Sequence, residues 1–221
     1  FGIKLIFYGE NNADHNESLA ESHLSLTEKS MYTHKNIDNL YLAGLKINDL
    51  VKNYGFKYND LLTFLPSKIN EIPKNLKVYY LGYFIKWVPQ EAYYYAVENT
   101  GFKARPFRTQ GTYSKYNSID DKIDDFHYYT TFIKFGIGRA TYDASQEIRN
   151  HHIDRDEAKA LVKRFDGEFP DKYFSEIMSY LGIKEKDFFK WCDSFRPPHL
   201  WVKKNGKWKL RHNVNKTGED D

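Results

Sequence analysis

The sequence has a single cysteine, no long apolar run and almost no excess of charge. Cys192 stands alone among 221 residues, which excludes an internal disulfide framework and disfavours a cysteine-based metal site within the chain. No apolar stretch approaches the ~20 residues that a membrane-spanning helix needs, and no signal-peptide pattern is recognisable. These absences predict a cytoplasmic protein without a membrane span.

The balance of charge argues against a general nucleic-acid surface. The chain has 33 basic and 30 acidic residues, for a net charge of +3. Lysines gather near the C-terminus, but they flank Asn205-Gly206 in WVKKNGKWKL, which is the signal for a two-residue hairpin. Solvated strand faces explain these lysines as well as a ligand would. We therefore expect a basic hairpin and no nucleic-acid partner.

Apolar and aromatic residues are abundant enough for a sizeable core. The hydrophobic share of 41% argues against disorder, and 221 residues suffice for one good domain. The 18 tyrosines are partly polar, as a surface that binds a sugar or a nucleotide would be, although core packing explains most aromatic residues in any protein.

Two segments in the first half are expected to form strands. The nearly continuous apolar run IKLIFY, residues 3–8, is typical of a buried parallel strand, and we expect its partners to lie outside this sequence. The run LKVYYLGYFI, residues 76–85, is the second candidate. Between them we expect a long loop over 11–36, helical spacing over 37–54 and a short helix over 59–65.

The second half is expected to be a series of helices. Pro89 begins one that Gly101 stops, and Ser118 is expected to cap the next. Asp154 and Glu157 form a capping-box pattern. With the strands, these segments predict an α/β fold that is predominantly helical in this chain. The expected helices are residues 89–99, 119–135, 140–150, 155–165, 171–181 and 185–195.

The segment KFGIGRATYDASQEIR, residues 134–149, carries the densest polar chemistry. It combines cations, carboxylates and hydroxyls with Gly136 and Gly138, which let backbone approach a ligand. Such a set suits a site for phosphate and a polar substrate. An ordinary helix–glycine–helix corner with solvated charges explains the same spacing.

Longer strings give a more specific signal. SIDDKIDDFHYYTTFIKFGIGRATYDASQEIR, HHIDRDEAKALVKRFDGEFP and FRPPHLW resemble the C-terminal part of the bacterial N-acetyl sugar amidotransferases, which belong to the ATP-pyrophosphatase (PP-loop) superfamily. The resemblance implies an adenine-nucleotide alpha-hydrolase-like fold. Residues 1–36 would end its nucleotide-binding domain, 37–200 would form a mainly helical substrate domain, and 201–221 a basic hairpin and tail.

Two features of that family are absent from this sequence. Nothing resembles its SGGxDS-type pyrophosphate loop, and its N-terminal cysteine pairs have no counterpart because Cys192 is alone. The chain also begins at Phe1 and enters an apolar run directly. We therefore expect the N-terminal half of the enzyme to be missing from this sequence and the chain alone to be inactive.

The resemblance suggests which residues handle ATP. The segment GENNADHNES is similar to the GExxD loop with which asparagine synthetases hold magnesium pyrophosphate; Glu10 matches, and Asp14 is displaced by one position. By the same analogy, Lys134 would stabilise the leaving pyrophosphate and Arg139 would contact the α-phosphate or the substrate. An exposed acidic loop and a solvated helix-end lysine are the plainer interpretations.

A further group is assigned to the substrate. Arg105 and Arg108 lie in a segment without clear periodicity, the usual place for contacts to an anionic sugar nucleotide. His127 would share a helix face with Lys134, and Asp143 lies within the polar segment. No residue is assigned as the ligand of a metal ion that protein side chains alone would hold.

These features together predict an ATP-dependent amidotransferase. The resemblance implies that ATP with Mg²⁺ activates the acetamido group of a nucleotide-activated sugar, and that ammonia from a separate glutaminase subunit converts it to an acetamidino group for a surface polysaccharide or flagellar glycan. A tRNA-modifying PP-loop enzyme is one alternative, which the charge balance disfavours. A non-catalytic helical interaction domain is the other, in which Glu10 and Lys134 would not converge on one cleft.

Overall fold

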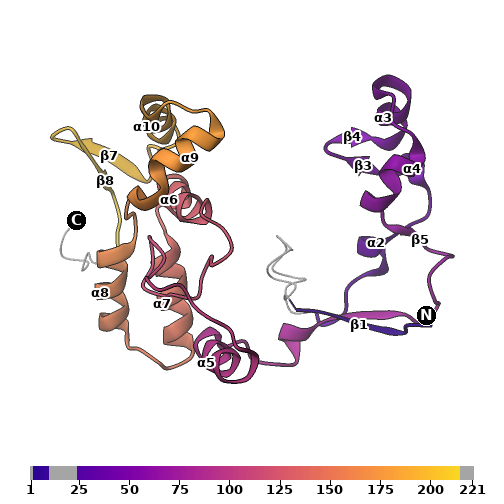
Figure 1. The fold of residues 1–221 in the computed structure, drawn as a ribbon, viewed down its shortest axis with the longest axis horizontal. Coiled ribbons are helices and arrows are strands. Elements are labelled where there is room, and N and C mark those ends of the chain that lie inside the picture. Colours follow the sequence, from indigo (N-terminus) through magenta and orange to yellow (C-terminus); the bar gives the residue numbers. More distant parts are fainter. Residues whose placement is uncertain (1, 10–23, 215–221) are drawn as a thin grey trace. The chain divides into compact units, whose positions relative to one another are not determined.

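The computed structural model describes residues 2–9 and 24–214, and the chain divides into two compact units (Figure 1). Unit 1 is Phe1–Trp87 and unit 2 is Val88–Asp221. The described residues form a mixed α/β fold with more helix than strand, as expected. None of their helices combines the length and the apolar character needed to cross a membrane. The functional divisions expected at 36/37 and 200/201 stay predictions.

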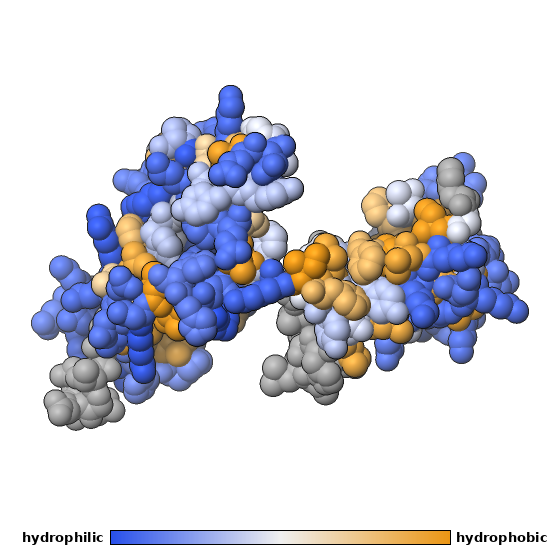
Figure 2. All heavy atoms as spheres, turned by 90° about the horizontal axis from the view of Figure 1, so that it is seen from below, coloured by the Kyte–Doolittle hydropathy of each residue, from blue (hydrophilic) through white to orange (hydrophobic). Residues whose placement is uncertain are grey.

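A parallel pair of strands in unit 1 confirms both strand predictions. β1 (Leu5–Tyr8) pairs with β6 (Lys77–Tyr80) from Leu5↔Lys77 to Tyr8↔Tyr80. The expectation that the partners of β1 lie outside the sequence was wrong, because β6 supplies one of them. The expected burial of β1 was also wrong: all of its residues are exposed, since no described residue of unit 1 covers them. Figure 2 shows apolar surface across this strand pair, to which Leu5 and Phe7 contribute at 51% and 48% exposure.

The segment 37–54 is not the continuous helix that its spacing indicated. It begins with the 3-10 turn η1 (Ile37–Asn39), continues as a hairpin of β3 (Tyr41–Leu42) and β4 (Leu45–Lys46), and ends in α3 (Ile47–Tyr54). Ala43 and Gly44 turn the hairpin with φ values of 51° and 80°, which a right-handed helix cannot contain. The apolar spacing was misleading because hairpin and helix pack on the same core.

The remaining elements of unit 1 are short. α2 (Lys29–Tyr32) precedes β2 (Thr33–His34), which pairs in parallel with β5 (Ser67–Lys68). α4 (Tyr58–Leu61) and η2 (Leu62–Phe64) form the helix expected before Pro66, and η3 (Leu81–Tyr83) follows β6. The core of this unit is built on Ile47, Leu50 and Leu61.

Unit 2 is helical apart from its C-terminal hairpin. The expected ends of several helices are confirmed: Gly101 adopts the left-handed conformation after α5, and Asp154 begins α8 with a capping box. The hairpin turns at Asn205-Gly206, as the sequence predicted. The elements are α5 (Pro89–Thr100), α6 (Asp124–Phe135), α7 (Arg139–Arg149), α8 (Arg155–Phe165), η4 (Asp171–Tyr173), α9 (Phe174–Leu181), α10 (Glu185–Ser194), β7 (Trp201–Lys204) and β8 (Lys207–Leu210).

α6 begins later than expected, and Ser118 does not cap it. Ser118 lies in the preceding loop with a φ of 53°. The side chain of Arg105 donates hydrogen bonds to the carbonyl oxygens of Ser118 and Asp121. Because these bonds occupy acceptors that a helix would use, residues 117–123 follow an irregular path.

The core of unit 2 joins α6, α9 and α10. Phe126, Ile177, Met178, Phe188 and Cys192 form a buried cluster. Cys192 is 6% exposed, as the sequence indicated, and burial raises the pKa of its thiol. The hairpin is tied to this core, since Trp201 Nε1 donates a hydrogen bond to the carbonyl oxygen of Ile133 at 2.7 Å.

Candidate functional site

An irregular loop, residues 102–123, connects α5 to α6 and forms one wall of the candidate site, with its buried positions between 109 and 114. Thr109 and Thr112 are fully buried within it. Its backbone closes on itself, with Thr109 N–H donating to Ser114 O at 3.0 Å, and it is tied to α7 by Ala140 N–H donating to Gly111 O at 3.1 Å. These bonds give buried backbone groups of the loop their partners and hold its middle against α7.

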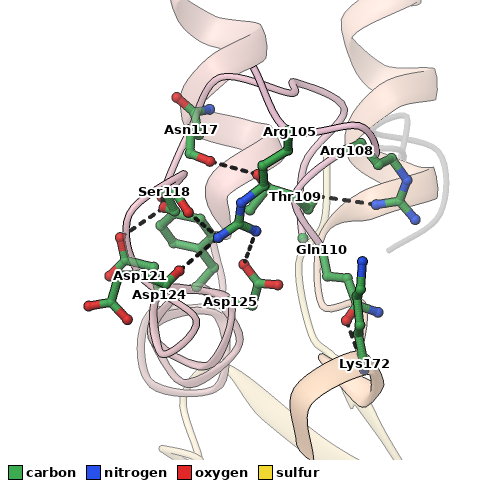
Figure 3. A network of polar contacts seen from close by, with 12 residues as sticks. Arg105, Arg108, Thr109, Gln110, Asn117, Ser118, Asp121, Asp124, Asp125 and Lys172 are labelled. Atoms are coloured by element: carbon green, nitrogen blue, oxygen red, sulfur yellow. Dashed lines mark hydrogen bonds and ion pairs between the residues drawn. The ribbon is translucent and has the colours of Figure 1, made fainter. Parts of the chain in front are cut away.

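Arg105 holds the interior of this loop, as Figure 3 shows. Its guanidinium lies 3.3 Å from Asp125, and the two side chains are only 8% and 2% exposed. It also donates to Asp121 O at 2.7 Å and to Ser118 O. Burial raises the pKa of Asp125, and the nearby Arg105 opposes that increase. These contacts give Arg105 a role in loop structure; its expected contact with substrate stays a prediction.

Arg108 ties the other side of the loop to the segment after α8. Its two terminal nitrogens bind both oxygens of Glu168, and its guanidinium lies 4.6 Å from the centre of the Phe165 ring. Glu168 also accepts a hydrogen bond from Gly111 N–H at 2.8 Å. Burial alone would raise the pKa of Glu168, but the bonds from Arg108 and Gly111 outweigh it and lower the pKa. Arg108 remains 36% exposed, so a ligand can still reach it.

Three charged residues of α7 lie on one helix face because they are spaced by one turn: Arg139, Asp143 and Glu147. Arg139 Nε donates to Asp143 Oδ1 at 2.8 Å. The other oxygen of Asp143 accepts from Thr112 Oγ1 at 2.5 Å and from Asn117 Nδ2 at 3.1 Å. Burial raises the pKa of Asp143, while Arg139 and Thr112 counteract the increase. The structure thus joins two predicted site residues, Arg139 and Asp143, to the loop.

Three tyrosines surround this face of α7. Burial and the carboxylates of Asp143 and Glu147 raise the pKa of Tyr113, and burial with Glu147 raises that of Tyr116 to about 12. Tyr128 places its ring 5.2 Å from the guanidinium of Arg139. We call the set Tyr113, Tyr116, Tyr128, Arg139, Asp143 and Glu147 the tyrosine–carboxylate cluster.

The cluster has hydrogen-bonding groups without partners. Tyr113 Oη is buried and has none among the residues that the structure describes. Arg139, held between the rings of Tyr128 and Tyr142, donates Nε to Asp143, and its two terminal nitrogens bind no other described residue. The buried Tyr113 hydroxyl costs about 1–3 kcal/mol while it has no partner. The Arg139 side chain is 27% exposed, so its terminal nitrogens can reach solvent or a ligand. Both donors favour binding of a polar ligand.

The far end of α7 adds a histidine. His152 Nδ1 lies 2.6 Å from Glu147 Oε2, and its Nε2 lies 3.9 Å from Glu91 of α5. Nearby, Asn150 Nδ2 is buried with no partner within the described ranges. The sequence analysis assigned no site role to His152 or to Glu147. The four-residue spacing of Arg139, Asp143 and Glu147 was the sequence pattern that could have indicated Glu147.

Lys134 and His127 are not members of the cluster, although the ring centroid of His127 lies 6.0 Å from that of Tyr128, and two further predicted residues lie outside the described ranges. Lys134 is exposed in the last turn of α6, beside a groove of about 640 Å³ that Phe195 and His199 also line. His127 is exposed on the same helix. Glu10 and Asp14 lie outside the described residues, so the expected convergence of Glu10 with Lys134 stays a prediction.

The glycines of the polar segment serve the turn between α6 and α7. Gly136 ends α6 in the left-handed conformation. At the start of α7, the carboxylate of Asp166 accepts hydrogen bonds from Gly138 N–H at 3.0 Å and Thr141 N–H at 3.1 Å. The helix N-terminus that would suit a phosphate is therefore filled by the protein's own carboxylate. The described residues also contain no group of three or more potential ligands for a metal ion.

One comparison, with models of protein families, found a match over part of unit 2. Residues 110–215 match the family model described as LPS biosynthesis protein WbpG-like, C-terminal domain. This segment is therefore a WbpG-like C-terminal domain, which confirms the family resemblance at that level. It contains the whole tyrosine–carboxylate cluster and the hairpin, while Arg105 and Arg108 precede it. No curated protein matches the chain.

Proposed function

We propose that the protein is part of an enzyme that modifies an N-acetylated nucleotide sugar in LPS biosynthesis, and that the tyrosine–carboxylate cluster binds the sugar. The observation that carries this proposal is the set of unpaired donors inside the matched domain: Tyr113 Oη and the terminal nitrogens of Arg139. Sugar hydroxyls and an acetamido carbonyl are acceptors for such donors, and tyrosine rings pack against the apolar face of a sugar.

The reaction we propose is conversion of the acetamido group to an acetamidino group. Overall, the nitrogen of ammonia replaces the acetamido oxygen, ATP is cleaved to AMP and pyrophosphate, and the oxygen leaves in AMP. ATP with Mg²⁺ supplies the driving force and a separate glutaminase subunit supplies the ammonia. By the resemblance to the GExxD loop, we assign to Glu10 and Asp14, which lie outside the described residues, the Mg²⁺ that would carry the phosphates.

Within this reaction, the residues of unit 2 bind and orient the sugar. The two hydrogen bonds from Thr112 and Asn117 and the ion pair with Arg139 fix the carboxylate of Asp143. In turn, Asp143 fixes the plane of the Arg139 guanidinium, so its free edge has one direction. An oriented donor pair suits recognition of one particular sugar hydroxyl or carbonyl oxygen. We propose Lys134 and Arg139 as the catalytic cations.

Isotope transfer in the complete enzyme tests the reaction. The acetamido oxygen of a nucleotide-activated N-acetyl sugar is replaced with ¹⁸O, and the enzyme is supplied with ATP, Mg²⁺ and ammonium ions. We expect ¹⁸O in AMP and an acetamidino product by mass spectrometry. AMP without ¹⁸O, or a product that keeps its acetamido group, would overturn the proposed reaction.

Matched arginine variants test the sugar site. Arg139→Ala removes a charged donor pair, so we expect a KM for the sugar about tenfold higher or more. Arg149→Ala removes the same charge from the exposed end of the same helix and should leave KM within about twofold. Equal effects of the two variants would refute the assignment of the cluster as the sugar site.

A further inference from the structure

The tyrosine–carboxylate cluster contains two carboxylates, and the first of them is engaged on both of its oxygens. Asp143 Oδ1 accepts a hydrogen bond from Arg139 at 2.8 Å. Its Oδ2 accepts from Thr112 at 2.5 Å and from Asn117 at 3.1 Å. With these three donors, Asp143 is suited to orienting its neighbours and poorly suited to taking a proton from a ligand.

The second carboxylate, Glu147, lies one turn further along the same face of α7 and is bonded on one side only. Its Oε2 lies 2.6 Å from Nδ1 of His152, whereas its Oε1 has no hydrogen-bond partner among the residues that the structure describes. An ionised carboxylate only accepts hydrogen bonds, so Nδ1 of His152 carries the proton between them. The Glu147 side chain is 12% exposed. It therefore has one oxygen that is held in place and one that a ligand can use.

The other polar groups of the cluster are donors and do not compete with Glu147 as bases. Burial is the main cause of the raised pKa of Tyr113 and of the pKa of about 12 at Tyr116, and the charge of Glu147 contributes to both. Both phenols are therefore protonated at neutral pH. The guanidinium of Arg139 cannot accept a proton. A solvated ion pair at the end of a helix explains the His152 contact by itself, but not an open carboxylate oxygen beside these donors.

We propose that Glu147 is the base that takes the proton from the acetamido nitrogen of the sugar, and that His152 is the positioning residue that orients Glu147. This rests on the proposed function, in which the acetamido oxygen attacks the α-phosphorus of ATP. As that bond forms, the bond from the α-phosphorus to pyrophosphate breaks, and pyrophosphate leaves with the electron pair. The nitrogen lone pair forms a C=N bond, and the N–H proton moves to Glu147 Oε1. The adenylated imidate that remains is ready for attack by ammonia.

Exchange of labelled pyrophosphate into ATP tests this step alone, in the complete enzyme with Mg²⁺ and a nucleotide-activated N-acetyl sugar but without ammonium ions. Glu147→Gln keeps the shape of the side chain and removes its basicity. We expect the exchange rate to fall by about 10²-fold or more, with the KM for the sugar changed by less than about threefold. Glu98→Gln, at an exposed glutamate of α5, should leave the rate unchanged. Normal exchange in the Glu147 variant, or an increase in KM alone, would overturn the inference.

Two substitutions at His152 test the positioning role. His152→Asn places an amide N–H close to the position of Nδ1 and keeps a donor to Glu147, whereas His152→Ala removes the donor. We expect exchange within about threefold of the native rate for the first variant and at least about tenfold slower for the second, with folding checked by thermal unfolding. Equal rates in the two variants would contradict the positioning role. Absence of sugar-dependent exchange in the native enzyme would overturn the proposed function itself, whereas exchange that survives in Glu147→Gln overturns only this inference.

Discussion

The carboxylate of Asp166 lies against the backbone of Gly138, whose N–H donates to it at 3.0 Å. A Cβ atom at position 138 would lie 2.6 Å from Asp166 Oδ1, which is closer than real contacts allow. The φ of Gly138 is −113°, which any residue can adopt. Glycine is therefore required by the close approach of Asp166 and not by backbone strain. Asp166 thereby caps α7 and sets the position of Arg139, the first residue of that helix.

Gly138→Ala should destabilise the protein by about 1–3 kcal/mol, because either Asp166 or the start of α7 has to shift. Thermal or urea unfolding measures the change. Gly9→Ala is the control, since a Cβ there meets no atom within 4 Å. If the two substitutions had the same effect, close approach to Asp166 could not be the reason for the glycine.

Arg105→Ala should be among the most destabilising substitutions in unit 2. It leaves Asp125 buried without its ionic partner and frees the carbonyl groups of Ser118 and Asp121, at a cost of about 3–5 kcal/mol. Lys122→Ala breaks an ion pair with Glu176 whose side chains are 52% and 56% exposed, and should cost less than about 1 kcal/mol. Urea unfolding of both variants compares a buried pair with an exposed one. Similar losses would mean that the Arg105 pair is solvated.

Glu168 should make stability depend on pH. Its pKa is lowered in the folded protein from the ordinary 4.5, so its ionised form stabilises the fold above that pH. The difference in unfolding free energy between the native protein and Glu168→Gln should be full at neutral pH. It should shrink as the pH falls below the ordinary value of 4.5 and through the lowered pKa. A difference that grows on acidification would contradict the assigned direction.

Tyr113→Phe should separate stability from binding. The substitution removes a buried hydroxyl that has no partner among the described residues, so stability should be unchanged or higher by up to about 1 kcal/mol. In the complete enzyme, the KM for the sugar should rise several-fold, because the ligand loses a hydrogen bond. Tyr180→Phe, at a side chain that is 76% exposed, should change neither quantity. A Tyr113→Phe enzyme with normal KM would remove Tyr113 from the sugar site.

Lys134→Ala tests the proposed catalytic cation. A group that stabilises charge in the transition state acts on the chemical step, so kcat in the complete enzyme should fall by roughly 10²-fold or more while sugar binding changes little. Lys190→Ala removes an equally exposed lysine from α10 and should leave kcat unchanged. Near-normal turnover of the Lys134 variant would exclude that role. An increase in KM alone would indicate a binding role instead.

Local signals decided how well the elements could be predicted. The capping box at Asp154, the Pro89 and Gly101 boundaries of α5 and the Asn205-Gly206 hairpin are confirmed, because each depends on residues next to one another in the chain. The start of α6 could not be predicted, because Arg105 draws the carbonyl groups before it into another set of bonds. The hairpin within 37–54 was missed because its apolar residues share the core of α3.

For the candidate site, the sequence determined the polar content of residues 134–149 and the helical spacing that puts Arg139 and Asp143 on one face. Only the tertiary structure decided which residues meet that face. Thr112, Asn117 and the three tyrosines come from the loop and from α6, which the buried pair of Arg105 and Asp125 joins to each other. Spacing along a helix follows from covalent geometry, whereas contacts between distant segments follow from how side chains fill a common interior.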